Sequence, residues 1–300
     1  MADVAFLGLG RMGAAMAQRL LDCGCRLHVF NRTPERAEKL VAQGARYFAT
    51  PRQACAGAEA IVSMVADDPA SKAIWRGPDG ALAAGLAPGT LAIECSTLSH
   101  AWVLELSAEV RSLGLRYIDS PVTGLPLAAA AGELTVLVGA ATEDLDAARP
   151  LLERCSQCIM HFGLPGTGTA YKLLVNMLGA VQIASVAETI AIAEKMGLDL
   201  GVVADALSSG QAASPQVIRN ARRMIDGQRD RSVVFTPQLR LKDVEYALAL
   251  ARTLRIGSPF GVLAARIYRE LGALGLAQAN ESEVIEVARK QPPDPSPGIA

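Results

Sequence analysis

A lysine and an asparagine one helical turn apart are the residues of this chain best suited to do chemistry. Lys172 and Asn176 lie in a stretch without strong turn signals, so we expect them to share one face of a helix. A lysine whose pKa is lowered by desolvation can give a proton to the alkoxide that hydride transfer leaves on a carbonyl, and can take it back in the reverse direction. The amide of Asn176 could orient the reacting oxygen or a carboxylate. A solvated lysine on an amphipathic helix is the alternative interpretation.

A glycine-rich motif near the start of the chain has the spacing of a dinucleotide-binding turn. Its six residues are all candidate cofactor-binding residues: Gly8, Leu9, Gly10, Arg11, Met12 and Gly13. The motif lies between an expected strand and an expected helix, which is the context it requires. Gly8 would permit the tight turn, Gly10 would let the backbone approach a pyrophosphate, and Gly13 would let the helix pack closely on the strand. The pyrophosphate would lie on the helix N-terminus, where N–H groups bind anions. A glycine-rich turn without a ligand is the alternative.

The end of the second expected strand indicates which dinucleotide would bind. It carries Asn31, Arg32 and Thr33, and no acidic residue that could accept hydrogen bonds from a ribose 2′-hydroxyl. Arg32 can bind a 2′-phosphate bidentately, and Arg36 lies one turn further on. We therefore expect NADP, with NAD held by Asn31 as the alternative.

A loop rich in proline and glycine follows the strand expected at 116–119. Loops at strand ends are where open α/β sheets bind their ligands. Ser120, Thr123 and Gly124 are candidate substrate-binding residues, because the Thr123 hydroxyl and the Gly124 N–H could hold a carboxylate. Taken alone, the loop is better explained as an ordinary turn.

The first half of the chain alternates short apolar runs with amphipathic stretches, which predicts a mostly parallel sheet with helices on both faces. Strands are expected at 4–7, 27–30, 60–64, 91–94, 116–119, 134–138 and 159–161. Helices are expected at 12–23, 34–42 with Thr33 as its N-cap, 100–113 and 143–154. The fold class is thus a doubly wound α/β Rossmann domain.

The second half has only helical patterns. A long helix is expected at about 168–195, and shorter ones at 200–208, 215–225, 237–254 and 259–271. The tail from 291 onward is expected to be frayed. We predict a Rossmann domain over 1–165 and an all-helical domain over 166–300, joined by the long helix.

Composition argues against several classes of protein. The chain has 300 residues, 51% of them hydrophobic, and a formal net charge of -1, so it can bury a large core and offers no electrostatic case for a nucleic-acid or membrane partner. Aromatic residues make up 4%, which weakens a base-stacking interpretation. No signal peptide and no apolar run of membrane-spanning length are expected. Six cysteines fit a reducing cytoplasm.

Cys155, Cys158 and His161 are spaced closely enough to suggest a metal site. No fourth ligand lies nearby in the sequence. A thioredoxin-type pair would open a helix, whereas this pair follows the end of one. No metal is predicted.

Several motifs in order resemble the β-hydroxyacid dehydrogenases, the group that contains 3-hydroxyisobutyrate dehydrogenase and the glyoxylate/succinic semialdehyde reductases. The matching segments are 8–13, Cys95-Ser96-Thr97, Asp119-Ser-Pro-Val-Thr-Gly124, Gly168-xxx-Lys172-xxx-Asn176 and Lys242-Asp243. Together they span nearly the whole chain, and the ordered set is far more specific than any single member.

The resemblance implies roles for these residues. Lys172 would be the catalytic acid/base, Thr123 and Gly124 the carboxylate loop, and Asn176 the substrate-orienting amide. Further candidate cofactor contacts are Met64, Val65, Thr97 at the nicotinamide ribose, and Lys242, which would reach the cofactor or substrate when the domains close. Without the resemblance, Lys242-Asp243 is a charge pair on a helix surface.

The implied function is NADP-dependent interconversion of a short β-hydroxy acid and its aldehyde or keto acid, by a homodimer or homotetramer. The family loop usually has Ser-Gly-Gly where this chain has Thr123, Gly124 and Leu125, followed by Pro126, and a second Asn where it has Met177. This added apolar bulk predicts that the smallest acids of the family are not preferred.

Two other functions stay open. Imine reductases have a similar fold and a similar Asn-Arg-Thr stretch, but they typically carry Asp or Tyr where this chain has Lys172. A cofactor-binding redox sensor without turnover is the other. A 6-phosphogluconate-type substrate is disfavoured, because Val175 and not His precedes Asn176.

Overall fold

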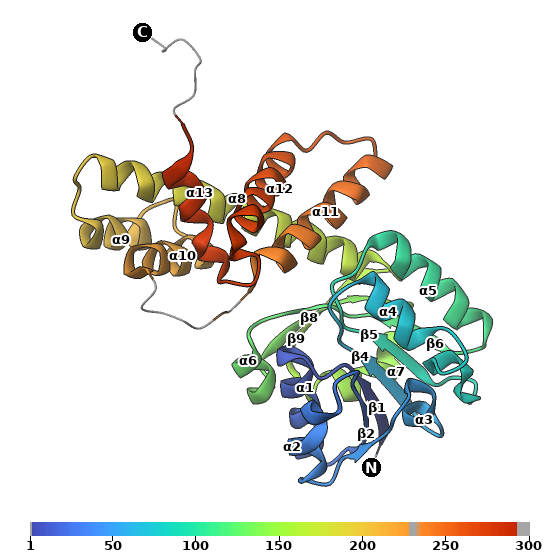
Figure 1. Cartoon of the computed structure of the whole chain (residues 1–300). Helices are drawn as coiled ribbons and strands as arrows, with labels where there is room; N and C mark the ends of the chain where they lie inside the picture. The colour runs from blue at the N-terminus through green and yellow to red at the C-terminus, as the bar shows by residue number, and fades with distance from the viewer. Residues whose placement is uncertain (1, 228–232, 234, 293–300) are drawn as a thin grey trace. The chain divides into compact units, whose positions relative to one another are not determined.

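The chain folds into two compact units, Met1–Leu174 and Val175–Ala300, and each is described by itself. The computed structural model (Figure 1) describes residues 2–227, 233 and 235–292. The expected fraying of the tail therefore falls largely outside the described residues.

The first unit is built on a sheet whose strand order is β3-β2-β1-β4-β5-β6-β8-β7, with β9 paired to β8. The strands are β1 Asp3–Leu7, β2 Arg26–Phe30, β3 Arg46–Tyr47, β4 Ala60–Ser63, β5 Leu91–Glu94, β6 Arg116–Asp119, β7 Val122–Thr123, β8 Leu134–Gly139 and β9 Ser156–Gly163. The neighbours from β3 to β6 are all parallel. Such an order places the carboxyl ends of β1 and β4 at the switch point where doubly wound sheets bind nucleotides.

Side chains alternate between two cores along each strand, as the period of an extended chain requires. Val4 and Phe6 of β1 face one core, and Ala5 and Leu7 face the other. The first core is covered by helices that include α1 Arg11–Asp22 and α7 Thr142–Leu152. The second is covered by α3 Pro51–Cys55, α4 Asp68–Trp75 and α5 His100–Ser112 (Figure 1). Two covered faces explain why the strands read as continuous apolar runs.

Several local details differ from the sequence expectation. The predicted helix at 34–42 is a 3₁₀ turn, Pro34–Ala37, followed by α2 Glu38–Val41, and Thr33 makes no side-chain cap. Short helices, α3, α4 and α6 Pro126–Ala131, were missed because fewer than three turns carry little periodic signal. β8 runs antiparallel to β6 and β7, a direction that apolar runs do not reveal.

The second unit is helical. Most of α8 Thr167–Lys195 lies in it, followed by α9 Leu200–Ser209, α10 Pro215–Asp226, α11 Pro237–Thr253, α12 Pro259–Leu271 and α13 Ile285–Lys290. Proline at the first turn and a Ser or Thr cap start α10 and α11, because such residues satisfy N–H groups that lack helical partners. The core of this unit packs α8 residues such as Ile183 against Val244 and Tyr268. The predicted fold class is confirmed.

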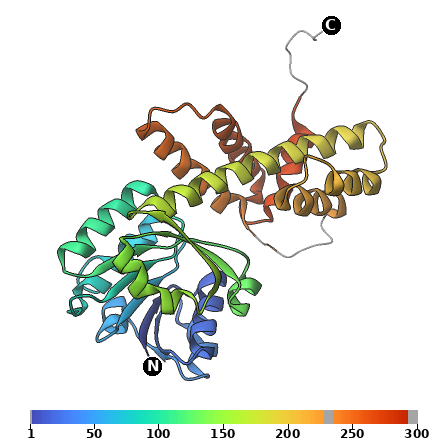
Figure 2. The ribbon, with the colours of Figure 1, turned by 180° about the vertical axis from the view of Figure 1, so that it is seen from behind.

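Helix α8 forms one continuous rod in Figure 2. Within the described part of the chain it is the one helix long and apolar enough to cross a membrane, so the expectation that no run reaches that length was wrong. In its most apolar window, 44% of the helix is buried inside the protein. Because a core helix meets the same test, this helix is only a weak indication of a membrane span.

Candidate active site

The glycine motif forms the turn between β1 and α1, and its glycines have different surroundings. Gly8 has a φ of +99°, and a Cβ there would overlap the Met64 carbonyl oxygen. A Cβ on Gly13 would overlap the Gly8 carbonyl oxygen. A Cβ on Gly10 would meet nothing within 4 Å. Two glycines thus let backbone pack on backbone, while Gly10 borders open space at the N-terminus of α1, the cradle that a pyrophosphate needs.

Asn31 braces this turn from the end of β2. Its Oδ1 accepts a hydrogen bond from the Leu9 N–H at 2.8 Å, and its Nδ2 donates to the Thr33 carbonyl oxygen at 2.8 Å. Arg32 beside it is exposed, as is Arg36, and neither has an ion-pair partner among the residues that the structure describes. Asn31 therefore shapes the turn, and Arg32 is the side chain at this strand end that extends into solvent.

A buried carboxylate that the sequence reasoning missed holds the turns after β4 and β5. Glu94 accepts hydrogen bonds from the Ser96 N–H at 3.0 Å and from Trp75 Nε1 at 2.8 Å. The Ser96 hydroxyl in turn accepts from the Val65 N–H at 2.8 Å. Met64, Val65 and Thr97 are half-buried at these turns. An acid at the end of an apolar strand was the signal that could have revealed Glu94.

The loop after β6 divides its candidate residues between core and surface. Ser120 is fully buried, and its Oγ lies 3.3 Å from Cys95 Sγ, so its side chain belongs to the core. Thr123 and Gly124 are exposed. Gly124 has a φ of +136°, a conformation that favours glycine. The structure thus presents Thr123 and Gly124, and not Ser120, at the surface of the first unit.

The predicted long helix carries Lys172 and Asn176 one turn apart, and both are half-buried. Asn176 Nδ2 donates to Asp243 Oδ2 at 2.6 Å. Lys242 Nζ lies 3.1 Å from Asp243 Oδ1, and Asp243 itself is buried. Since a carboxylate only accepts, this contact fixes the amide of Asn176 with its NH₂ toward Asp243. Asp243 was not among the predicted site residues.

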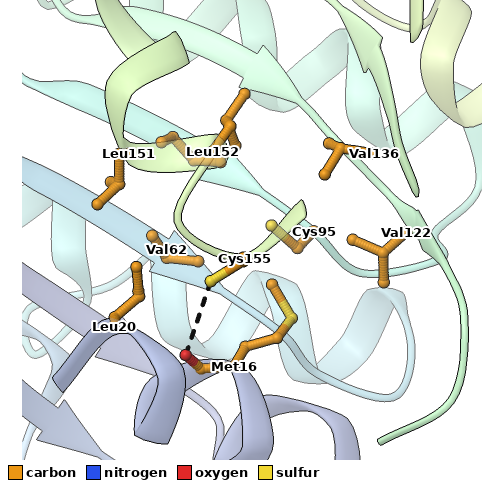
Figure 3. A pocket seen from close by; sticks show the side chains of 10 residues that line it. Met16, Leu20, Val62, Cys95, Val122, Val136, Leu151, Leu152 and Cys155 are labelled. Atoms are coloured by element: carbon orange, nitrogen blue, oxygen red, sulfur yellow. Dashed lines mark hydrogen bonds between the residues drawn. The ribbon is translucent and has the colours of Figure 1, made fainter. Parts of the chain in front are cut away.

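A small cavity lies in the first core, on the face of the sheet covered by α1 and α7, and none of the predicted site residues lines it (Figure 3). It has a volume of about 20 Å³, enough for roughly one water, and its lining is apolar apart from cysteine thiols. Burial raises the pKa of both lining thiols, Cys95 and Cys155, to about 12. The Cys155 thiol donates to the Met16 carbonyl oxygen at 3.8 Å. These cysteines are inert packing residues.

Cys158 is exposed in β9, whereas Cys155 is buried before it. Across residues 2–227, 233 and 235–292, no group of at least three His, Cys, Asp or Glu side chains is arranged to hold a metal ion.

Two known protein families together match most of the chain. Residues 3–163 match the NAD binding domain of 6-phosphogluconate dehydrogenase. Residues 166–288 match the NAD-binding domain of NADP-dependent 3-hydroxyisobutyrate dehydrogenase. NAD-dependent L-serine dehydrogenase of Pseudomonas aeruginosa is 36% identical over 95% of this chain and 97% of its own length. The chain belongs to the β-hydroxyacid dehydrogenase family. As a β-hydroxyacid dehydrogenase it is an oxidoreductase with a nicotinamide cofactor.

Solved structures of other proteins agree with this assignment. Mycobacterium tuberculosis 3-hydroxyisobutyrate dehydrogenase with L-serine has a TM-score of 0.87 and 32% identity, covering 96% of this chain and 99% of its own. Psf3 in complex with NADP+ and 2-OPP has a TM-score of 0.84 and 28% identity, covering 95% and 99%. Imine reductases are 20–23% identical over at least 96% of this β-hydroxyacid dehydrogenase, a likeness that shows the fold alone.

Proposed function

We propose that this β-hydroxyacid dehydrogenase interconverts a short β-hydroxy acid and its aldehyde or keto acid with NADP, and that Lys172 is the general acid/base. The observation that carries the proposal is the half-buried Lys172 in the second turn of α8. At the start of this helix the Gly166 N–H donates a hydrogen bond to Asp119 at the end of β6. The loop with Thr123 and Gly124 follows that strand. When bound, the nicotinamide supplies or accepts the hydride.

Lys172 would carry out the proton transfer. The hydride adds to the carbonyl carbon with its electron pair, and the C=O π pair moves to the oxygen, which then takes a proton from the Lys172 ammonium; in the reverse direction the amine takes the hydroxyl proton. One N–H of the Asn176 amide is donated to Asp243, which leaves its second N–H and its Oδ1 for a substrate. Asn176 would therefore orient the substrate, with Oδ1 accepting from a hydroxyl or the second N–H donating to the reacting oxygen or a carboxylate. The Thr123 hydroxyl and the Gly124 N–H would bind the substrate carboxylate.

Two observations support NADP over NAD. Arg32 is exposed at the end of β2, where a 2′-phosphate would lie, with no acidic residue beside it. Asn31 Oδ1 already accepts from the Leu9 N–H, which leaves one lone pair for a ribose hydroxyl, fewer than the carboxylate of an NAD site offers. The relatives differ: the L-serine dehydrogenase is NAD-dependent, and Psf3 was solved with NADP+.

The cofactor preference is tested by Arg32→Ala, with Lys39→Ala on neighbouring α2 as a charge-matched control. We expect the ratio of kcat/KM with NADPH to that with NADH to fall about tenfold or more, since a charged hydrogen bond to the phosphate is lost. The control should keep the ratio within about twofold. A wild-type preference for NADH would refute the proposal.

The altered residues near the loop support a substrate larger than glyoxylate. Leu125 is 39% exposed and precedes Pro126, the first residue of α6. Met177 Sδ lies against Gly261 of α12, where a Cβ would approach it to 2.7 Å. Met177 therefore packs within the second unit, and Leu125 is the added bulk that a substrate would meet. Preferential turnover of glyoxylate over every longer or branched semialdehyde would contradict this part of the proposal.

The main test is Lys172→Ala against Lys195→Ala, an exposed lysine at the other end of α8. Turnover of aldehyde and keto acids by the first variant should fall by roughly 10²–10⁴, with the NADPH dissociation constant within about twofold of wild type. The control should retain both. Full turnover by Lys172→Ala would show that Lys172 is not the general acid/base. Reduction of cyclic imines only would favour an imine reductase, and NADPH binding without turnover of any compound would favour a sensor.

We also propose a homo-oligomer, a homodimer or homotetramer. Large apolar side chains are exposed on the second unit, among them Ile192 at 61%, Phe260 at 73% and Val262 at 57%. Exposed apolar surface of this kind marks association sites in proteins. A monomeric mass by light scattering at micromolar concentration would contradict this.

A further inference from the structure

Asp119 is a fully buried carboxylate for which the proposed reaction has no use. It ends β6 and directly precedes the loop that carries Thr123 and Gly124. Its Oδ1 accepts a hydrogen bond from the Gly166 N–H at 2.6 Å, and its Oδ2 accepts one from the Thr169 N–H at 2.7 Å. Both donors lie at the start of α8, where N–H groups have no partner within the helix.

Glycines bring the start of α8 into direct contact with the sheet beside this carboxylate. A Cβ on Gly168 would overlap the Leu137 carbonyl oxygen of β8. A Cβ on Gly139 would overlap the Asp119 carboxylate, and one on Gly166 would lie 2.8 Å from Leu104 Cδ2. Without side chains at these positions, backbone N–H groups can reach Asp119. The helix start is therefore held at a fixed distance from the strand end.

The charge of Asp119 is compensated by these N–H groups. No salt bridge to Asp119 occurs in the described part of the chain. A negative charge at a helix N-terminus interacts favourably with the helix dipole, and charge-assisted hydrogen bonds are stronger than neutral ones. The contact is thus directional and hard to replace by packing.

We propose that Asp119 is a positioning residue for Lys172: by binding the first turn of α8 to the end of β6, it fixes the lysine relative to the Thr123–Gly124 loop. Lys172 lies one turn beyond Thr169, and a helix transmits a shift of its first turn to the next. Misplacement of a catalytic group by about 1 Å can lower a rate about 100-fold. This inference rests on the proposed role of Lys172.

The neighbouring strand offers an internal contrast. Glu94 is in register with Asp119 on β5 and is also buried, but it holds the turn of Ser96 and Val65 on the cofactor side. Two adjacent carboxylates thus hold different parts of the site. Loss of Glu94 should weaken NADPH binding, whereas loss of Asp119 should slow the proton step.

The test is Asp119→Asn, which keeps the volume but turns an NH₂ group toward one of the two N–H donors. A matched control is Asp199→Asn, the N-cap of α9, whose Oδ1 accepts from the Gly201 and Val202 N–H groups in the other unit. For Asp119→Asn we expect kcat to fall roughly ten- to a hundredfold. KM and the NADPH dissociation constant should change by less than about threefold, and amides at 166–172 should exchange faster with solvent. The control should change neither kcat nor exchange at 166–172.

Several outcomes would overturn the inference. An unchanged kcat in Asp119→Asn, with or without faster exchange, would mean that Asp119 does not position Lys172. A fall in turnover that matches the loss of NADPH-binding protein would mean that it only supports folding. If the amide variant does not fold, Asp119→Ser provides the same comparison with a smaller group. Failure of Lys172→Ala to lower turnover would refute the proposed function, whereas the exchange result at 166–172 reports on the Asp119 contact independently.

Discussion

The glycine turn of the first unit and the polar cluster of the second hold their candidate residues by different means. At the turn, Gly8 and Gly13 let backbone pack on backbone, and the N–H groups of α1 are left facing the space beside Gly10. In the second unit, Asn176 is held by charged side chains: its side-chain amide donates to Asp243, and its backbone carbonyl oxygen accepts from Arg240 Nη1 at 3.2 Å.

The second cluster extends to a buried ion pair. Arg240, 4% exposed, donates through Nη2 to Glu281 Oε2 at 2.6 Å and through Nε to the same oxygen at 2.8 Å. Arg219 lies 3.3 Å from the other carboxylate oxygen of Glu281. A turn formed by close backbone contacts is destabilised when a side chain is added to one of its glycines. A cluster of charged side chains is destabilised when one of the charges is removed. The two units should therefore respond to opposite kinds of substitution.

The largest effect should follow removal of one charge from the second cluster. Glu281→Gln leaves Arg240 buried without its anion, which typically costs 3–5 kcal/mol, so the free energy of unfolding should fall by about that amount. Glu245→Gln, which breaks an exposed pair with Arg269, is the control and should cost less than about 1 kcal/mol. Denaturation by urea measures both. Equal small losses in the two variants would show that the buried pair is no more important than a surface pair.

The glycine turn should respond to an added methyl group according to position. Gly13→Ala forces the new Cβ against the Gly8 carbonyl, so we expect about 1–3 kcal/mol of lost stability. Gly10→Ala meets no atom within 4 Å and should keep stability within about 1 kcal/mol, while its methyl blocks the approach of the pyrophosphate. Thermal unfolding and NADPH titration separate the two results. Unchanged NADPH affinity in Gly10→Ala would place the pyrophosphate elsewhere.

The last effect concerns Asp119 and pH. Burial raises the pKa of Asp119 from 3.8 to about 6, against the lowering effect of the Gly166 and Thr169 N–H groups, with buried Tyr117 and Glu94 nearby. A raised carboxyl pKa contributes stability that is fully present below the unfolded value near 3.8 and is lost as the pH rises through about 6. Wild type should thus lose up to about 3 kcal/mol relative to Asp119→Asn between pH 4 and 7. A constant difference across this range, measured by urea denaturation at each pH, would contradict the shift.

The candidate site was predictable where spacing along the chain determines it. Gly8, Gly10 and Gly13 act within one turn, and Lys172 and Asn176 share a face of one helix because they are four residues apart. The strand-helix alternation likewise predicted the doubly wound sheet. Local patterns of this kind need no knowledge of what the rest of the chain does.

Other features depend on residues that only folding brings together. Ser120 was predicted to bind substrate, yet its hydroxyl lies beside Cys95, 25 residues away along the chain. Asn31 was predicted to contact the cofactor, and only the fold shows that its oxygen also accepts from the Leu9 N–H across 22 residues. In a loop or at a strand end, periodicity does not determine which way a side chain points, so these directions could not be read from the sequence.

The sequence by itself determined the Rossmann and helical patterns, the glycine turn and the pairing of Lys172 with Asn176 on one helix, because each depends on neighbours within a few residues. The tertiary structure alone decided which buried charges hold them. Asp119 meets Gly166 across 47 residues, and Asp243 meets Asn176 across 67. A buried carboxylate requires hydrogen-bond donors, but only the packed fold decides which donors reach it.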